Sequence, residues 1–364
     1  MSRERLIAAF LDRHGYGSAR AEPLAQDASF RRYLRLTGGP RLAVLMDAPP
    51  PEDIRPFVRI AGHLAGIGMS APVIFAVDEA EGLLLEEDLG DDLVSALMSP
   101  PPLAGGGWGE GAIGTALPSP PNPLPQGEGE SGVLSSSSLH FTAAVDTLVT
   151  TQRAAPPRNL PTWDVATMTT TALAMLFDWW WPAMFGACAP EAARCDFAAA
   201  LETMLAPVAS GPVCFVHRDF FAGNLLWLPQ RSGIRRIGVL DFQGAALGHP
   251  AYDLASLLQD ARRDIPPKLA EHVIAHYLDA RPELDPVAFR TAYAACAAQR
   301  HLRIVGQWVR LAQRDGRPGY LIHGPRTWRL LQQAVREPVA ARLAAALDRW
   351  IPPDRRANPP GLAA

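Results

Sequence analysis

Three polar side chains stand at a spacing that suits phosphoryl transfer. The segment Phe215-Val-His-Arg-Asp-Phe-Phe-Ala-Gly-Asn-Leu225 places Asn224 five residues after Asp219, and a later apolar run ends at Asp241. A carboxylate at Asp219 can accept a hydrogen bond from an attacking hydroxyl and orient it. An amide oxygen from Asn224 and a carboxylate from Asp241 are the hard ligands that Mg²⁺ prefers on a triphosphate. Asp219 or Asn224 taken alone would be equally well explained as a turn residue. The full pattern, however, predicts Asp219 as the catalytic residue and Asn224 and Asp241 as metal ligands.

Short strands must deliver these residues to one place. Residues 213–216 and 237–240 are apolar runs, and each is followed at once by a polar side chain. The remaining sequence from residue 139 onward has the period of helices. Helices are expected at 139–153, 164–185, 191–206, 251–261, 266–280, 286–314 and 326–348.

The first 90 residues have a different pattern. Ser2 can cap a first helix, strands are expected at 30–36, 41–46, 73–77 and 83–86, and a helix is expected over 52–65. The sequence therefore predicts an α+β chain with a small antiparallel-sheet lobe over 1–90 and a mainly helical lobe over 91–364.

One segment of the second lobe departs from this pattern. Residues 99–138 are rich in Pro, Gly and Ser, including Pro100-Pro-Pro102 and Gly105-Gly-Gly107. Such a composition buries too little apolar surface to offset chain entropy, so an insertion without stable structure is expected. A proline-rich ligand for another protein is the alternative, but no protein partner is implied elsewhere.

Composition narrows the classes of function. The chain has 364 residues, is 48% hydrophobic and 20% charged, and has a net charge of −3. This is typical of a globular protein and gives no electrostatic reason for binding nucleic acid or a membrane surface. The charged start, Met1-Ser-Arg-Glu-Arg5, is unlike a signal peptide. A cytoplasmic location with reduced cysteines is expected.

The motifs resemble the aminoglycoside phosphotransferase and choline kinase family, which has a bilobal protein-kinase-like fold. The resemblance implies that residues 1–90 form a nucleotide-binding lobe and that ATP and Mg²⁺ are used. Glu86-Glu-Asp-Leu89 would be the hinge, so that Glu87, Asp88 and Leu89 meet the adenine. His217 and Asp253 would support the catalytic loop, although Asp253 could instead cap the helix that follows it.

The phosphate-binding elements differ from the usual kinase pattern. The segment Asp27-Ala-Ser-Phe-Arg-Arg-Tyr33 has no glycine, and the strand at 41–46 has no lysine, because Lys268 is the sole lysine of the chain. Either the chain is a silent nucleotide-binding module, or the loop itself holds the phosphates. In the second case the contacts would come from Ser29, Phe30, Arg31 and Arg32, through backbone N–H groups, a hydroxyl and guanidinium groups.

Further segments are similar to one bacterial subgroup, the anomeric kinases for N-acetylmuramate and N-acetylglucosamine. They include Met46-Asp-Ala-Pro-Pro50, Asp241-Phe-Gln-Gly-Ala245 and Asp253 to Asp264. The resemblance implies transfer of a phosphoryl group to the anomeric hydroxyl of an amino sugar during cell-wall recycling. It also implies that the missing lysine is normal for the subgroup.

The sugar pocket is expected to face Asp219 from the helical lobe. A sugar is bound by Asp, Asn, Arg or Gln side chains, so Asp260, Arg263 and Arg310 are the main candidates. Asp264, Gln299, Arg300 and Arg314 are further candidates. A choline-type kinase or another sugar kinase remains the alternative, but Trp179, Trp180 and Trp181 point in three directions on a helix and cannot form one cation cage.

Overall fold

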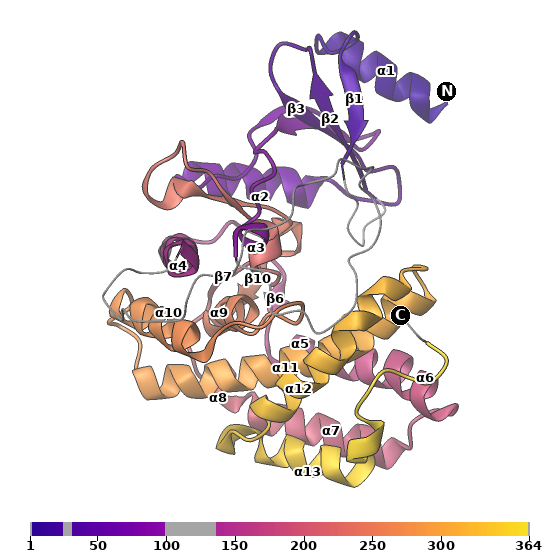
Figure 1. The fold of residues 1–364 in the computed structure, drawn as a ribbon, viewed down its shortest axis with the longest axis vertical. Helices are drawn as coiled ribbons and strands as arrows, with labels where there is room; N and C mark the ends of the chain where they lie inside the picture. Colours follow the sequence, from indigo (N-terminus) through magenta and orange to yellow (C-terminus); the bar gives the residue numbers. More distant parts are fainter. Residues whose placement is uncertain (1, 25–30, 99–135, 363–364) are drawn as a thin grey trace, which may run out of the picture.

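The computed structural model describes residues 2–24, 31–98 and 136–362, and its first lobe is a five-stranded antiparallel sheet. The strands are β1 (Arg20–Pro23), β2 (Arg32–Thr37), β3 (Ala43–Asp47), β4 (Ile74–Asp78) and β5 (Leu83–Glu87), in the order β1-β2-β3-β5-β4. The helices are α1 (Arg3–Arg13) and α2 (Arg55–Gly66), at the top of Figure 1.

Alternation along the strands divides the sheet into two faces. Leu36, Leu45 and Leu85 are buried against Phe10 and Leu11 of α1. The side chains that point the other way, such as Met46 and Leu84, join the main core together with α2. The sheet is thus covered by one helix on each face, and only the α2 face is continuous with the core of the second lobe.

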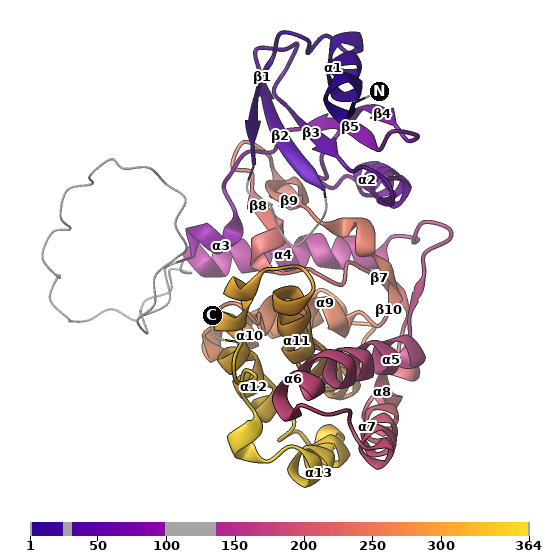
Figure 2. The same cartoon turned by 90° about the vertical axis from the view of Figure 1, so that its right-hand side faces the viewer.

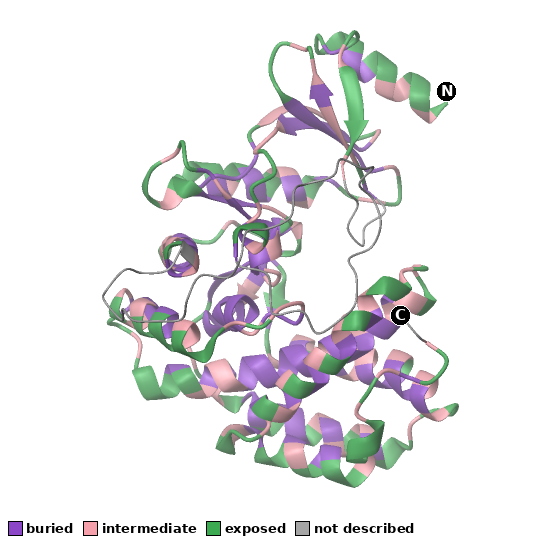
Figure 3. Cartoon of the chain, viewed as in Figure 1, coloured by how far each residue is buried: buried purple, intermediate pink, exposed green. Residues whose placement is uncertain are grey.

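The second lobe is built of helices around two small sheets. Its principal helices are α4 (Ser136–Arg153), α5 (Val165–Met175), α7 (Glu191–Met204), α9 (Ala251–Leu258), α10 (Pro267–Asp279), α11 (Pro286–Gln313), α12 (Gly324–Ala334) and α13 (Ala341–Trp350), and its shorter ones include α3 (Val94–Leu97), α6 (Trp181–Phe185) and α8 (Ala206–Ala209). The long helix α11 runs through the middle of the lobe, beside α5, α9 and α12 (Figure 2). All residues of α9 and much of α11 are buried, so these two helices form the buried centre of the lobe (Figure 3).

The small sheets lie where the two lobes meet. One has the order β6 (Thr162–Trp163), β10 (Ala246–Gly248) and β7 (Cys214–Val216), and the other is a hairpin of β8 (Leu225–Trp227) and β9 (Ile237–Val239). The N–H of Val239 donates to the carbonyl of Ser70 at 2.8 Å, and Phe242 stacks on Phe57 of α2 at 4.7 Å between ring centroids. The hairpin is therefore joined directly to the first lobe.

The α+β prediction with a sheet-rich first lobe and a helical second lobe is confirmed, and two predicted helices are interrupted. The helix expected at 164–185 contains a π-helical stretch, η1 (Leu176–Trp180), between α5 and α6. The helix expected at 326–348 ends at Ala334 and restarts after Pro338, whose ring and missing N–H do not fit a helix interior. Most of the predicted insertion at 99–138 lies outside the described residues.

The structure also shows the length and polarity of the helices and the state of the cysteines. No helix of the described ranges is long and apolar enough to cross a membrane. Cys188, Cys195, Cys214 and Cys296 are all free thiols, as the sequence predicted.

Candidate active site

The loop that carries Asp219 is hydrogen-bonded to a buried carboxylate, that of Asp253. Asp253 of α9 accepts hydrogen bonds from the backbone N–H of His217 at 2.6 Å and of Arg218 at 2.8 Å. Burial raises the pKa of Asp253 to about 6, while His217 and the two N–H groups act in the opposite direction. Asp253 contacts the loop rather than capping its own helix, which is the geometry that the supporting role requires.

His217 and Arg218 connect the loop to its other neighbours. The His217 ring nitrogen Nε2 lies 2.9 Å from the carbonyl of Leu240, and burial lowers the pKa of this imidazole. Arg218 has a φ of 75° and donates to the carbonyl of Gly244 at 3.2 Å. Its guanidinium lies 3.9 Å from the ring centroid of Trp163, a cation–π distance. The loop is thereby linked to the segment that carries Asp241.

Asn224 and Asp241 converge because of the β8–β9 hairpin. Leu225 pairs with Val239, so the residues just outside this pair lie side by side at the same end. The Asn224 amide nitrogen donates to the carbonyl of Asp219 at 2.9 Å and to Oδ2 of Asp241 at 3.4 Å. This leaves an amide oxygen and a carboxylate, a set of oxygen ligands that fits a hard divalent cation. Gln243 donates to Oδ1 of Asp241 at 2.6 Å and orients it.

The charges around Asp219 favour its ionised form. Burial raises the pKa of this carboxyl, but Arg303 and Arg300 of α11, with His217 and Arg218, outweigh burial and hold the pKa below its usual range. Asp219 is therefore a weak base that can orient a hydroxyl by accepting its hydrogen bond. Arg303 was not singled out in the sequence, although it lies three residues after Arg300 and so shares its helical face.

The predicted acceptor residues lie on and after α9 and on α11. Arg300 is only 2% exposed, and its Nη2 donates to the hydroxyl of Ser256 at 2.7 Å. In the described part of the chain, its Nε and Nη1 have no hydrogen-bond partner. Asp260 is buried near Arg300. Burial raises the pKa of its carboxyl, and the charges of Arg262 and Arg300 partly offset this rise.

Arg263 and Arg310 lie at the edge of the same region. Burial lowers the pKa of Arg263, and the nearby Asp260 partly offsets this effect. Burial also lowers the pKa of Arg310, and Arg303 is among the cations that add to this effect. The region thus holds more cations than carboxylates, and its charge does not suit a polycationic acceptor.

Other candidates named from the sequence have structural contacts. Gln299 is buried and donates to the carbonyl of Met168 at 2.7 Å, which holds α11 against α5. Arg314 pairs with Asp315 at 2.6 Å. Asp264 pairs with Arg326 and with Arg329 on α12. The tryptophan run packs in the helical lobe, where Trp180 lies against Trp328 and Trp181 against Phe185.

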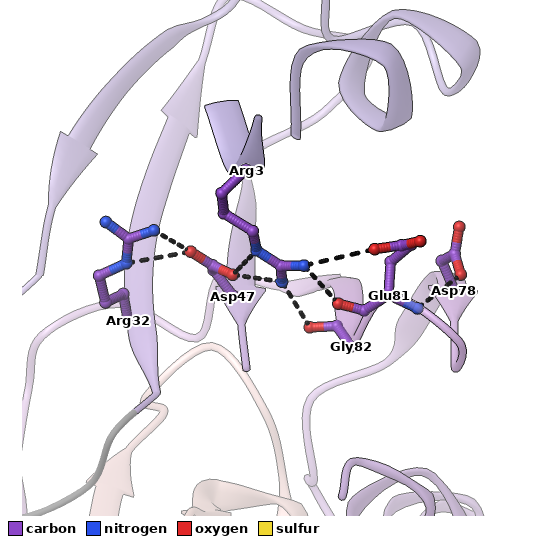
Figure 4. A network of polar contacts seen from close by, with 6 residues as sticks. All are labelled: Arg3, Arg32, Asp47, Asp78, Glu81 and Gly82. Atoms are coloured by element: carbon purple, nitrogen blue, oxygen red, sulfur yellow. Dashed lines mark hydrogen bonds and ion pairs between the residues drawn. The ribbon is translucent and has the colours of Figure 1, made fainter. Parts of the chain in front are cut away.

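The two arginines at the start of β2 lie on different sides of the sheet. Arg32 pairs with Asp47, which also binds Arg3 of α1, on the α1 face (Figure 4). Arg31 lies on the α2 side, where its Nε donates to Glu52 at 3.0 Å and its Nη2 to the carbonyl of Asp53 at 3.3 Å. Of the two, Arg31 is the one on the side of the catalytic loop. Ser29 and Phe30 lie outside the described residues.

The side chains of the predicted hinge form ion pairs. Glu87 accepts from Arg231 at 2.5 Å, and Asp88 pairs with Arg35 at 2.6 Å. Leu89 packs near Gly238 of β9. Because these side chains are engaged with protein groups, a contact with a nucleobase would fall to the backbone, as the resemblance implied.

Comparisons with known proteins support the relationship suggested by the motifs. The model of the phosphotransferase enzyme family (APH) matches residues 20–109 and 128–289. A protein named N-acetylmuramate/N-acetylglucosamine kinase from Caulobacter vibrioides is 35% identical over 97% of this chain and 98% of its own length. One of the same name from Pseudomonas aeruginosa is 32% identical over 89% of this chain and 87% of its own length.

A solved structure has the same fold. The choline/ethanolamine kinase family protein from Mesorhizobium loti matches 96% of this chain and 100% of its own chain with a TM-score of 0.57 at 15% identity. The kinase-like fold and the family predicted from the sequence are thus confirmed. The chain belongs to the phosphotransferase enzyme family and is an ATP-dependent kinase that acts on a hydroxyl acceptor.

Proposed function

We propose that this enzyme is a sugar 1-kinase that phosphorylates the anomeric hydroxyl of N-acetylmuramate, N-acetylglucosamine or both. The observation that carries the proposal is the grouping of Asp219, Asn224 and Asp241 opposite an arginine-rich face of α11, in a chain whose 35% identical relative is named as a kinase of these sugars. Its place would be the cytoplasm, where ATP is available, and its product would serve cell-wall recycling.

The nucleotide would bind between the hinge and the catalytic loop. The backbone at Glu87, Asp88 and Leu89 would meet the adenine, and Arg31 with Ser29 and Phe30 would meet the phosphates in place of a lysine. Arg32 contributes less in this proposal, because it is paired with Asp47. Asn224 and Asp241 would hold Mg²⁺, which screens the triphosphate charge when bound.

The acceptor would lie near Asp260 and the arginines of α11. A hydroxyl-rich sugar offers partners for Asp260, Arg263 and Arg310, and an attached carboxylate suits the positive charge of Arg300 and Arg303. A polycation such as an aminoglycoside, or a quaternary cation such as choline, would instead be repelled by these guanidinium groups.

The transfer step follows from the position and charge of Asp219. The acceptor hydroxyl donates a hydrogen bond to this carboxylate, and its oxygen attacks the γ-phosphorus in line with the leaving oxygen. A new sugar O–P bond forms, the bond to the β-phosphate oxygen breaks, and ADP leaves. The hydroxyl proton passes to Asp219 and then to solvent. Since the pKa of Asp219 is low, orientation of the hydroxyl contributes more than proton affinity.

The test is a phosphoryl-transfer assay with Mg-ATP and a panel of acceptors. We expect turnover of N-acetylmuramate or N-acetylglucosamine and none of their 1-O-methyl glycosides, because the methyl group blocks the anomeric oxygen. Turnover of choline or kanamycin instead would overturn the sugar assignment. ATP binding without transfer to any acceptor would favour the silent module.

A variant of the catalytic carboxylate tests the mechanism. Asp219→Asn keeps the shape of the side chain but removes its charge, and we expect turnover to fall by about 10²–10⁴-fold. Affinity for ATP, measured by calorimetry, should be retained. Turnover close to that of the unmodified enzyme would contradict the role given to Asp219.

A further inference from the structure

Arg262 lies between the catalytic loop and the helices behind the acceptor region. Its guanidinium carbon is 4.2 Å from the ring centroid of Phe221 and 5.3 Å from that of Trp308, both within the range of cation–π contacts. Phe221 and Trp308 are buried, so the guanidinium lies between two rings that are packed in the protein interior. These two rings come from parts of the chain that are far apart in sequence.

Phe221 belongs to the short stretch between Asp219 and Asn224. Its backbone N–H donates to the carbonyl of Asp219 at 3.2 Å, and its carbonyl accepts from the N–H of Asn224 at 2.8 Å. Its ring also packs on Gly223 so closely that a Cβ there would come within 2.5 Å of it. The ring of Phe221 is therefore fixed relative to both the catalytic carboxylate and the metal ligand.

The backbone of Arg262 is held on both sides. Its N–H donates to Oδ1 of Asp260 at 2.9 Å, and its carbonyl accepts from Nη1 of Arg326 on α12 at 2.8 Å. Trp308 is fixed in turn, because its indole N–H donates to Thr327 at 2.9 Å and its ring stacks on Tyr320 at 5.6 Å. The Arg262 side chain therefore links the turn at 260–263 to the ring of Phe221.

We propose that Arg262 is a positioning residue that couples acceptor binding at the turn 260–263 to the placement of Asp219 and Asn224. The inference rests on the proposed function, because Asp260 and Arg263 are taken as acceptor contacts. An acceptor that hydrogen-bonds to Asp260 restrains the turn, and the restrained guanidinium holds the ring of Phe221. The loop is then best ordered when the acceptor is in place.

The test compares Arg262→Met with Arg262→Lys. Methionine keeps apolar bulk between the rings but removes the cation, whereas lysine keeps a cation. We expect Arg262→Met to lower kcat with the sugar about tenfold, with KM for Mg-ATP unchanged within about twofold. Arg262→Lys should restore most of kcat. The matched control is Arg329→Met, which removes an α12 arginine that pairs with Asp264 at 2.6 Å, and its kcat should stay within about twofold of that of the unmodified enzyme.

A double-mutant cycle separates coupling from a general loss of structure. In a Phe221→Leu background, Arg262→Met should have little further effect on kcat, because the contact is already lost. Additive effects, or a kcat for Arg262→Met equal to that of the unmodified enzyme, would overturn the inference. If the unmodified enzyme phosphorylates no sugar, the proposed function fails first; if it does and the cycle is additive, only the role of Arg262 fails.

Discussion

At the scale of single residues, the site depends on a carboxylate that stays ionised among cations. Asp219 is surrounded by Arg303, Arg300 and Arg218, and the sum of their fields exceeds the cost of burial. Arginine keeps its charge across the whole working range of pH, so this effect does not depend on pH near neutrality. Asp219 is therefore kept ionised mainly by groups that do not titrate near neutral pH.

The pH dependence of the reaction follows from this arrangement. A carboxyl whose pKa lies below its usual value is ionised above about pH 4, so kcat/KM for the acceptor should have no acidic limb from Asp219 between pH 5 and 8. Arg303→Gln removes a cation, which raises the pKa of Asp219 and moves the acidic limb to higher pH. The measurement is a pH profile of both enzymes.

A control for this profile lies on the same helix. Arg290 of α11 pairs with Glu271 at 3.0 Å, and it lies nearly four helical turns before Arg303, about 20 Å along the helix axis. Arg290→Gln should leave the profile of the unmodified enzyme in place. A limb that stays at the same pH in Arg303→Gln would mean that Arg303 does not set the charge of Asp219.

At the scale of elements, helix α11 brings Arg300 and Arg303 close to Asp219. How closely α11 packs against α5 depends on one glycine. At Gly306, a Cβ would lie 1.9 Å from the carbonyl oxygen of Met175, where α5 passes into η1. Only a residue without a side chain allows this approach of two backbones. The close crossing sets how far Arg300 and Arg303, on the same helix, extend toward Asp219.

Substitution at this crossing gives a test of stability. Gly306→Ala should lower the free energy of unfolding by about 1–3 kcal/mol, because one helix must shift to admit the methyl group. Gly62→Ala in α2 meets nothing within 4 Å and should raise that free energy by about 0.5–1 kcal/mol through helix propensity. Denaturant unfolding measures both. Equal effects of the two changes would contradict the close crossing.

At the scale of the whole molecule, the candidate site draws on both lobes, and one segment of the second lobe lies outside the family model. In the proposed site, the first lobe would contribute the hinge and Arg31, and the second would contribute Asp219, Asn224 and Asp241. The family model leaves residues 110–127 unmatched, within the Pro-, Gly- and Ser-rich segment. No residue assigned to the site comes from that segment.

A deletion tests whether the segment matters for catalysis. Replacement of residues 101–133 by a Gly/Ser linker of about ten residues should leave kcat and both KM values within about twofold, since helices α3 and α4 keep their own sequences. A control with the full length kept and its prolines replaced should behave in the same way. A large loss of activity in the deletion alone would show that the segment has a role in the reaction.

The grouping of Asp219, Asn224 and Asp241 could be predicted from the sequence because the motifs that carry them have local spacing. The path from strand to loop to Asn224 spans a few residues, and the apolar run before Asp241 marks a second strand end. The family, the fold class and the sheet-rich first lobe follow from the same patterns. Local alternation and turn chemistry specify these features without knowledge of distant contacts.

Only the tertiary structure decided which of several similar side chains face the candidate site. Arg31 and Arg32 are neighbours in sequence but lie on opposite sides of the sheet, and Asp47 with Arg3 decides the position of Arg32. Arg300 and Gln299 are likewise adjacent on α11, yet one faces Asp219 and the other α5. The physical reason is that a helix or strand presents its residues in every direction, and packing against distant elements selects the face that meets the substrate.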